Sequence, residues 1–204
     1  MGFYSSYIFP YILEWAMSGP ELDEERSQAL SGTHGEVLEI GFGTGRNLPF
    51  YPPQVSRLTA IDSNPAMNRM ALHRMEESSL SVDLQTLNGE LLPLDAGRFD
   101  CVVSSWTLCS IARVELALAE IVRVLKPDGS FHFVEHGLSP EPSVAAWQHR
   151  LNPLQKLIGD GCHLNRDMRQ LVSDVGLEIV QLDNHYLPRS PRVLGYLYRG
   201  VAHK

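Results

Sequence analysis

Residues 36–47 read EVLEIGFGTGRN, an apolar run that passes into three glycines on alternate positions. Val37, Leu38 and Ile40 predict a buried strand, and the glycines after it let the backbone turn sharply and approach a ligand closely. We expect a helix to begin at this turn. The free N–H groups and the positive dipole end of that helix would favour a ligand carboxylate or phosphate at the turn. The stretch therefore predicts the first strand and ligand-binding turn of an α/β fold.

The spacing of the glycines argues against a dinucleotide cofactor. The NAD or FAD fingerprint requires Gly-x-Gly-x-x-Gly, and counting from Gly41 puts Arg46 where the third glycine belongs. The pattern instead resembles the first motif of class I S-adenosylmethionine-dependent methyltransferases, with the residues Glu39, Gly41, Gly43 and Gly45. This resemblance implies that the turn holds the methionine end of S-adenosylmethionine and that Glu39 helps to bind its amino group. A glycine-rich turn without a ligand is the alternative.

Length and composition indicate one globular domain with a small-molecule acceptor. The 204 residues are 44 % hydrophobic and carry a net charge of −7, without a basic run that could follow a phosphate backbone, so we expect no nucleic-acid partner. Cys101, Cys109 and Cys162 form no Cys-x-x-Cys pair. Without a recognisable signal peptide, these cysteines indicate reduced thiols in the cytoplasm and predict neither a structural disulfide nor a metal site.

The first 17 residues, MGFYSSYIFPYILEWAM, are aromatic and apolar. They lack the basic region of a signal peptide, contain Pro10 and Glu14, and are too short to span a bilayer. We predict that residues 1–30 form a helical arm that docks on a methyltransferase domain of residues 31–204 and can cover its cleft. Contact with a membrane surface through residues 1–17 is the alternative.

Alternating strand and helix patterns predict a three-layer α/β sandwich. We expect strands at residues 36–40, 57–61, 82–88, 99–105 and 130–136, and helices at 113–125, 165–176 and after a cap at Asn64. Two last strands, 177–186 and 193–201, must be antiparallel, because a parallel return needs a crossover of a dozen or more residues. The prediction is a seven-stranded, mostly parallel, Rossmann-like sheet with a C-terminal antiparallel hairpin and a ligand at the carboxyl ends of its strands.

Two places along the chain predict contacts with the adenosine part of the cofactor. Asp62 closes the second strand, where a carboxylate can accept hydrogen bonds from both ribose hydroxyls, and Ser63 follows it. A helix-capping aspartate is the alternative. The sequence NGELLPL then resembles the segment that flanks adenine in class I methyltransferases, which implies contacts from Asn88, Gly89 and Glu90. A plain surface turn is the alternative there.

The ends of the next two strands supply candidates that face the transferred methyl group and the acceptor. Ser105 and Trp106 follow the fourth strand and are expected to line the cleft, with Cys109 in the core. The fifth strand ends in Glu135 and His136, either of which could orient the substrate or take a proton.

A closer resemblance covers the chain from about Tyr7 to the C-terminus. Residues 151–167, LNPLQKLIGDGCHLNRD, together with the Glu-His strand end and the FYPP after the first motif, resemble the methyltransferase-like protein 7 family and its bacterial relatives. The members characterised in function are thiol S-methyltransferases, which implies methyl transfer to a small thiol with S-adenosylhomocysteine as product. They are attached to membranes by a longer hydrophobic segment, so that attachment does not carry over to this chain.

The chemistry of a thiol acceptor suggests which residues act. Its pKa lies near 8.5, so an enzyme gains by stabilising the thiolate, for which His136, His163 and Arg166 are candidates. Methyl transfer is an in-line displacement that depends on alignment and needs no metal. Three alternatives stay open: histidines that only satisfy backbone groups, a lipid amine or quinone phenol as acceptor, and a cofactor-binding domain without activity. The oligomeric state is left open.

Overall fold

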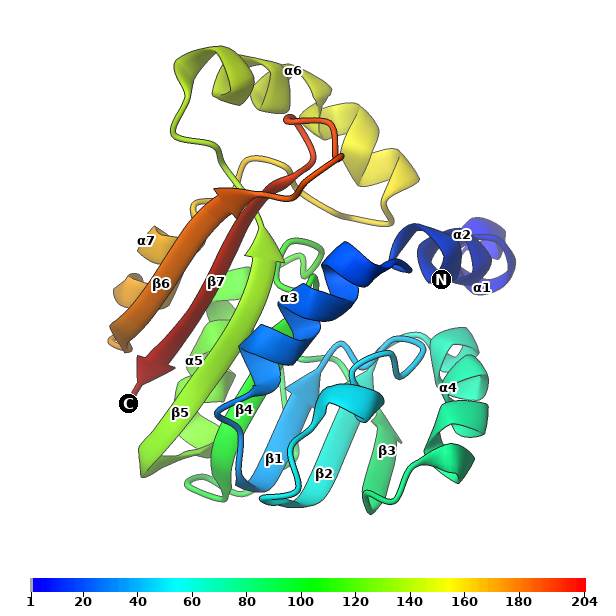
Figure 1. Ribbon diagram of the computed structural model, residues 1–204, viewed down its shortest axis with the longest axis vertical. Helices are drawn as coiled ribbons and strands as arrows, with labels where there is room; N and C mark the ends of the chain where they lie inside the picture. The colour runs from blue at the N-terminus through cyan, green and yellow to red at the C-terminus, as the bar shows by residue number, and fades with distance from the viewer. Residues whose placement is uncertain (1) are drawn as a thin grey trace.

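A seven-stranded sheet runs through the computed structural model, which describes residues 2–204 (Figure 1). Its order is β3-β2-β1-β4-β5-β7-β6; β7 pairs antiparallel with β5 and β6, and the other neighbouring pairs are parallel. The strands are β1 Gly35–Ile40, β2 Val55–Asp62, β3 Val82–Thr86, β4 Phe99–Ser105, β5 Leu125–His136, β6 Glu178–Tyr186 and β7 Tyr196–His203. The predicted mostly parallel sheet with a C-terminal hairpin is confirmed.

Helices cover both faces of the sheet and give the predicted three layers (Figure 1). One face is covered by α3 and α4, which pack on β5 and β2 respectively, and the other by α5 and α7. The helices are α1 Phe3–Tyr7, α2 Phe9–Ala16, α3 Pro20–Leu30, α4 Pro65–Glu77, α5 Val114–Val124, α6 Pro142–Ile158 and α7 Met168–Asp174. Within residues 2–204, none of these helices has the length and apolar character needed to cross a membrane.

The two faces of β1 belong to different parts of the core. Leu38 and Ile40 pack in a cluster with side chains of α5 and α7, whereas Val37 packs in a second cluster with Leu30 of α3 and Ala71 of α4. Successive residues of a strand point to opposite faces, so a strand covered on both sides must be apolar at nearly every position. This burial accounts for the apolar residues Val37, Leu38 and Ile40 of the strand.

The expected α-helix after the glycine turn is wrong. Only a 3-10 turn, η1 Leu48–Phe50, lies between β1 and β2. Pro49 occupies that turn, and the pair Pro52-Pro53 follows directly, which forces the preceding residues toward extended conformations and prevents helical continuation. The glycine turn therefore brings no helix dipole to a ligand, and the N–H groups of Gly41 and Gly43 are donated to the Ile61 carbonyl and to Asp62. The predicted cap at Asn64 is confirmed, since its side chain accepts a hydrogen bond from the Ala66 N–H.

Candidate active site

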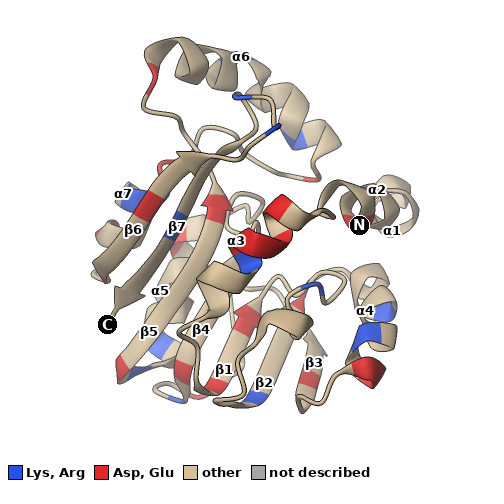
Figure 2. Cartoon of the chain, in the orientation of Figure 1, with Lys and Arg blue, Asp and Glu red and all other residues tan. Residues whose placement is uncertain are grey.

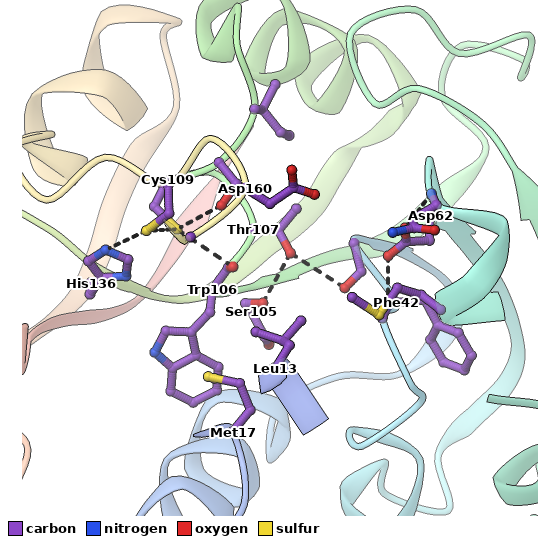
Figure 3. A pocket seen from close by; sticks show the side chains of 18 of the residues that line it. Leu13, Met17, Phe42, Asp62, Ser105, Trp106, Thr107, Cys109, His136 and Asp160 are labelled. Atoms are coloured by element: carbon purple, nitrogen blue, oxygen red, sulfur yellow. Dashed lines mark hydrogen bonds between the residues drawn. The ribbon is translucent and has the colours of Figure 1, made fainter. Parts of the chain in front are cut away.

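A cavity of about 650 Å³ opens at the carboxyl ends of β1, β2 and β4 (Figure 3). From β1 the chain continues to β2 and β3 on one side of the sheet, and β4 then pairs with the other side of β1. The cavity lies at this reversal of strand order, which is the usual ligand site of such sheets. Its volume falls within the range of about 300–1,000 Å³ that small-molecule sites occupy. Figure 3 shows Asp62 and Phe42 at one end of the cavity, His136 and Cys109 at the other, and Trp106, Ser105 and Thr107 between them.

The glycines of the turn have different roles. Gly41 has a φ of +78°, and a Cβ atom there would lie 1.9 Å from Thr107 Oγ1, so only glycine fits. Gly43, with a φ of +57°, lines the cavity and donates its N–H to Asp62 Oδ2 at 2.8 Å. Gly45 does not line the cavity and lies against the Phe42 ring, which a Cβ atom at Gly45 would approach to 3.3 Å. The turn is thus shaped by all three glycines but open to a ligand at the first two.

Glu39 is a buried carboxylate on the cavity wall. It is 1 % exposed and accepts hydrogen bonds from Asn47 Nδ2 at 2.8 Å and from the Tyr51 hydroxyl at 2.6 Å. Burial raises the pKa of Glu39 to about 8, although these two hydrogen bonds and the charge of Arg26 oppose the rise. A carboxylate held in this way favours a cationic partner. Asn47 and Tyr51 are not among the predicted site residues, although both lie within twelve residues of Glu39.

Asp62 and Ser63 line the cavity where β2 ends. The second oxygen of Asp62 accepts from the Asn64 N–H at 2.7 Å, so both carboxylate oxygens are held by backbone donors, one from Gly43 and one from Asn64. Burial raises the pKa of Asp62, and the two backbone hydrogen bonds oppose that rise. The carboxylate is therefore fixed in place beside the glycine turn, and Asn64, not Asp62, caps α4.

Asn88, Gly89 and Glu90 line the cavity, and the residue before them, Leu87, donates its N–H to the Asp62 carbonyl. The Asn88 side chain accepts from the Glu90 N–H at 3.0 Å, which closes a local turn. The Glu90 carboxylate is turned to Arg113, from which it accepts a backbone bond at 2.9 Å and an Nε bond at 2.8 Å. These bonds hold the pKa of Glu90 below its usual value. The three residues therefore line the cavity in a closed turn, and their contact with adenine stays a prediction.

Ser105 and Trp106 both line the cavity after β4. Ser105 Oγ accepts from Asn47 Nδ2 at 3.0 Å, which connects it to the Glu39 carboxylate. Trp106 has a φ of +48°, a conformation that costs a bulky residue energy, and its indole ring lies 5.0 Å from the Arg26 guanidinium. Such strain at a cavity wall often accompanies a functional role.

Four residues are predicted to act on the methyl acceptor: Glu135, His136, His163 and Arg166. Of these four, only His136 lines the cavity. His163 Nδ1 lies 3.1 Å from the Cys109 carbonyl oxygen, and burial lowers the pKa of His163. Arg166 donates to the carbonyl oxygens of Leu108 and of Ile111, the latter at 2.7 Å. Both side chains therefore hold the loop after β4 rather than face a ligand.

Glu135 is also placed away from the cavity, so the expectation that it takes a proton from the substrate does not match the structure. It is fully buried and accepts hydrogen bonds from Ser104 Oγ at 2.8 Å and from the backbone N–H groups of Thr107 and Leu108 at 2.9 and 3.0 Å. Successive residues of a strand point to opposite faces, so Glu135 lies beneath the loop while its neighbour His136 faces the cavity.

Three side chains that are distant in the sequence meet at the His136 end of the cavity. Cys162 Sγ lies 3.1 Å from His136 Nε2 and 3.7 Å from Cys109 Sγ. The hydrogen bond with Cys109 and burial raise the pKa of the Cys162 thiol well above its usual range. The two cysteines are 1 % and 6 % exposed and belong to the core, yet both also line the cavity. Cysteine spacing along the chain gives no sign of this cluster.

Helix α2, in the N-terminal arm formed by α1 and α2, lines one side of the cavity. Leu13 and Met17 line it from this side (Figure 3). Between them in the sequence, the Glu14 carboxylate accepts from Arg46 at 2.6 Å and from Arg74 at 2.7 Å, and also from Thr44 Oγ1, so it fastens the arm to the glycine turn and to α4. From the sequence alone, Glu14 is only evidence against a membrane-spanning segment, and these ion pairs are not predicted. Whether residues 1–30 act as a separate lid stays a prediction.

Known proteins are similar to this chain in sequence and in fold. A family described as a methyltransferase domain matches residues 38–133. The chain is 34 % identical to thiol S-methyltransferase TMT1B of Rattus norvegicus over 92 % of its own length and 84 % of that protein, and 28 % identical to phosphatidylethanolamine N-methyltransferase of Cereibacter sphaeroides over 72 % of each. Its fold is similar to that of a methyltransferase of Thermotoga maritima described as a possible histamine N-methyltransferase, with a TM-score of 0.70, 20 % identity and coverage of 98 % and 97 %. The chain therefore belongs to the class I S-adenosylmethionine-dependent methyltransferases, in one family with the mammalian thiol S-methyltransferases.

Proposed function

We propose that this enzyme transfers the methyl group of S-adenosylmethionine to the sulfur of a small thiol. The observation that carries the proposal is the position of His136, an imidazole on the cavity wall at the end opposite Asp62 (Figure 3). An imidazole can take up the proton of a thiol at neutral pH. The similarity to a thiol S-methyltransferase across nearly the whole chain supports the same acceptor.

The residues at the other end of the cavity fit the cofactor. Gly41 and Gly43 leave room for the methionine part, because a side chain at either position would be strained and at Gly41 would collide with Thr107. The buried Glu39 carboxylate suits the ammonium group, and Asp62 suits the ribose hydroxyls. The backbone of residues 88–90 suits adenine. The cofactor supplies the methyl group and leaves as S-adenosylhomocysteine.

The proposed reaction needs alignment and one proton acceptor. His136 Nε2 takes the proton from the acceptor thiol, which leaves a thiolate able to accept the methyl group that the bound cofactor would supply. Cys162 Sγ lies 3.1 Å from the same nitrogen and must give up this contact when Nε2 accepts the proton, because a ring nitrogen has a single lone pair. His163 and Arg166 contribute indirectly, since their bonds to the carbonyl oxygens of Leu108, Cys109 and Ile111 hold the loop after β4. Holding the two reactants in line supplies most of the rate enhancement.

An acceptor panel combined with one substitution tests this function. Release of S-adenosylhomocysteine is measured with thiols, amines and phenols between pH 6 and 9. We expect turnover with thiols, and a loss of about 100-fold or more in His136→Asn that is largest at low pH, where little thiolate forms spontaneously. His149→Asn, which removes an exposed imidazole bonded only to Asn165, is the matched control. Thiol turnover that is unchanged in His136→Asn across this pH range would remove His136 from the mechanism.

A lipid amine is the second candidate acceptor. The similarity to a phosphatidylethanolamine N-methyltransferase favours it, and so does the arm beside the cavity, where Phe3, Tyr11 and Trp15 are 72 %, 68 % and 79 % exposed. Figure 2 shows few charged side chains on α1, α2 and α6. Methyl label recovered in lipid and absent from small thiols would support this acceptor over the first. Nothing favours the non-catalytic alternative, because the chain belongs to a family of enzymes.

A further inference from the structure

Cys109, His136 and Cys162 form a cluster of metal-binding side chains. They come from the loop after β4, the last residue of β5 and the loop after α6. The two sulfur atoms and the imidazole nitrogen all lie within 4.8 Å of one another, and all three residues line the cavity. In the proposed methyl transfer only His136 takes up a proton, so the presence of two thiols beside it is left unexplained by the proposed function.

The distances are close to those of a zinc site. With Zn–S bonds of about 2.3 Å and a Zn–N bond of about 2.0 Å, a tetrahedral ion separates two sulfurs by about 3.8 Å and a sulfur from a nitrogen by about 3.6 Å. The observed Cys162–Cys109 separation is 3.7 Å and the Cys162–His136 separation is 3.1 Å. The remaining edge is at most 4.8 Å. Adjustments of about 1 Å or less, within the reach of side-chain rotation, would complete the triangle of ligands.

We propose that Cys109, His136 and Cys162 bind one Zn²⁺ ion whose fourth coordination position opens to the cavity. Thiolate and imidazole ligands select zinc over magnesium or calcium, which prefer oxygen. On binding, the two thiols release two protons while the metal brings two positive charges, so the net charge of the buried site does not change. The ion would occupy the imidazole nitrogen that takes the proton in the proposed reaction, so this proposal concerns a metal-bound form of the free enzyme, whatever acceptor the metal-free form methylates.

The surrounding structure holds the ligands in place before any metal binds. The backbone carbonyl of Cys109 accepts from the His163 N–H at 2.8 Å, and its N–H lies 3.4 Å from a Glu135 oxygen. Arg166 fixes the same loop through the Leu108 carbonyl. Ligands that are already held in place lose less entropy on coordination. The rigid loop therefore favours binding.

The test uses the full chain without an affinity tag, kept reduced and first freed of metal. Zn²⁺ binding is measured by competition with a chromogenic chelator, and Co²⁺ is added separately as a spectroscopic probe. We expect one Zn²⁺ per chain, and with Co²⁺ a thiolate charge-transfer band together with the visible bands of tetrahedral coordination. A wild-type protein that binds no stoichiometric Zn²⁺, or that binds Co²⁺ without a thiolate band, would overturn the proposal.

Substitutions assign the site. Cys162→Ser and Cys109→Ala are each expected to weaken Zn²⁺ binding by at least about 100-fold, more than the loss of a merely supporting residue. Cys101→Ser is the matched control, because Cys101 is equally buried and has an imidazole neighbour, His34, 3.6 Å away. Circular dichroism and S-adenosylhomocysteine binding establish that each variant is folded. Equal binding in the control and in both site variants would also refute the assignment.

Discussion

The Glu14 carboxylate fastens the arm over the cavity, and its removal gives a direct test of how the site is closed. Glu14→Gln keeps the size of the side chain but removes the charge that pairs with Arg46 and Arg74. The three side chains are 23 %, 21 % and 30 % exposed, so the ion pairs are neither fully buried nor on the open surface. Leu13 and Met17, which line the cavity, belong to the same segment.

The expected cost follows from this partial burial. Exposed ion pairs contribute about 0–1 kcal/mol, and breaking a fully buried pair costs about 3–5 kcal/mol, so the loss of two half-buried pairs should cost about 2 kcal/mol. This energy corresponds to an increase of about 30-fold in the equilibrium constant for opening of the arm. Burial raises the pKa of Glu14, but hydrogen bonds from Thr44, Arg74 and Arg46 outweigh it and lower the pKa overall. The contact is therefore present in full above the pKa of an unfolded glutamate and is lost as the pH falls through the folded value.

Hydrogen exchange of α2 measures this opening. The amides of residues 11–16 should lose about 30-fold in protection in Glu14→Gln, while those of the central strands should not change. In the wild type the same protection should fall in acid, and in the variant it should not. Glu21→Gln is the matched control, because Glu21 pairs with Arg189, which is 87 % exposed. Unchanged protection of α2 in Glu14→Gln would show that the other contacts of the arm, such as the hydrogen bonds from Tyr4 to the Ile158 carbonyl and from Arg46 to the Glu14 carbonyl, hold it without the ion pairs.

Further predictions concern the turn and its carboxylate. Gly43→Ala should destabilise the protein by about 1–2 kcal/mol, because its φ of +57° strains a residue with a side chain although the Cβ atom itself has room. Gly41→Ala should cost about 1–3 kcal/mol more, because its Cβ atom would also collide with Thr107. Equal denaturation midpoints for the two variants would contradict this. Because the pKa of Glu39 is raised to about 8, its protonated form stabilises the free protein below the unfolded pKa, and that contribution is lost as the pH rises toward 8. Binding of the ammonium group of S-adenosylhomocysteine should then release a proton at pH 7, detected as a binding enthalpy that varies with the ionisation enthalpy of the buffer in the wild type and not in Glu39→Gln.

Local causes explain why β1 and the glycine turn could be predicted from the sequence. The apolar character of Val37 and Leu38 follows from burial on both faces of one strand, and the glycines are required by backbone conformations at their own positions. The helix expected after the turn failed for a reason that is also local, since the prolines that follow prevent it. Strand order was not predicted, because pairing is decided between segments far apart.

Sequence by itself determined the fold class, the cofactor class and the residues that follow each strand end, because side-chain period and backbone sterics act over a few neighbouring residues. Only the tertiary structure decided which of those side chains face the cavity. In the structure Glu135 lies beneath the loop after β4, whereas His136 faces the cavity. Glu14 pairs with Arg46 of the glycine turn and with Arg74 of α4. The tertiary structure also brought Cys109 and Cys162 to the same imidazole. Contacts between residues this far apart in the sequence depend on the conformations of the loops that follow the strands. Those conformations are set by the packing of the whole chain.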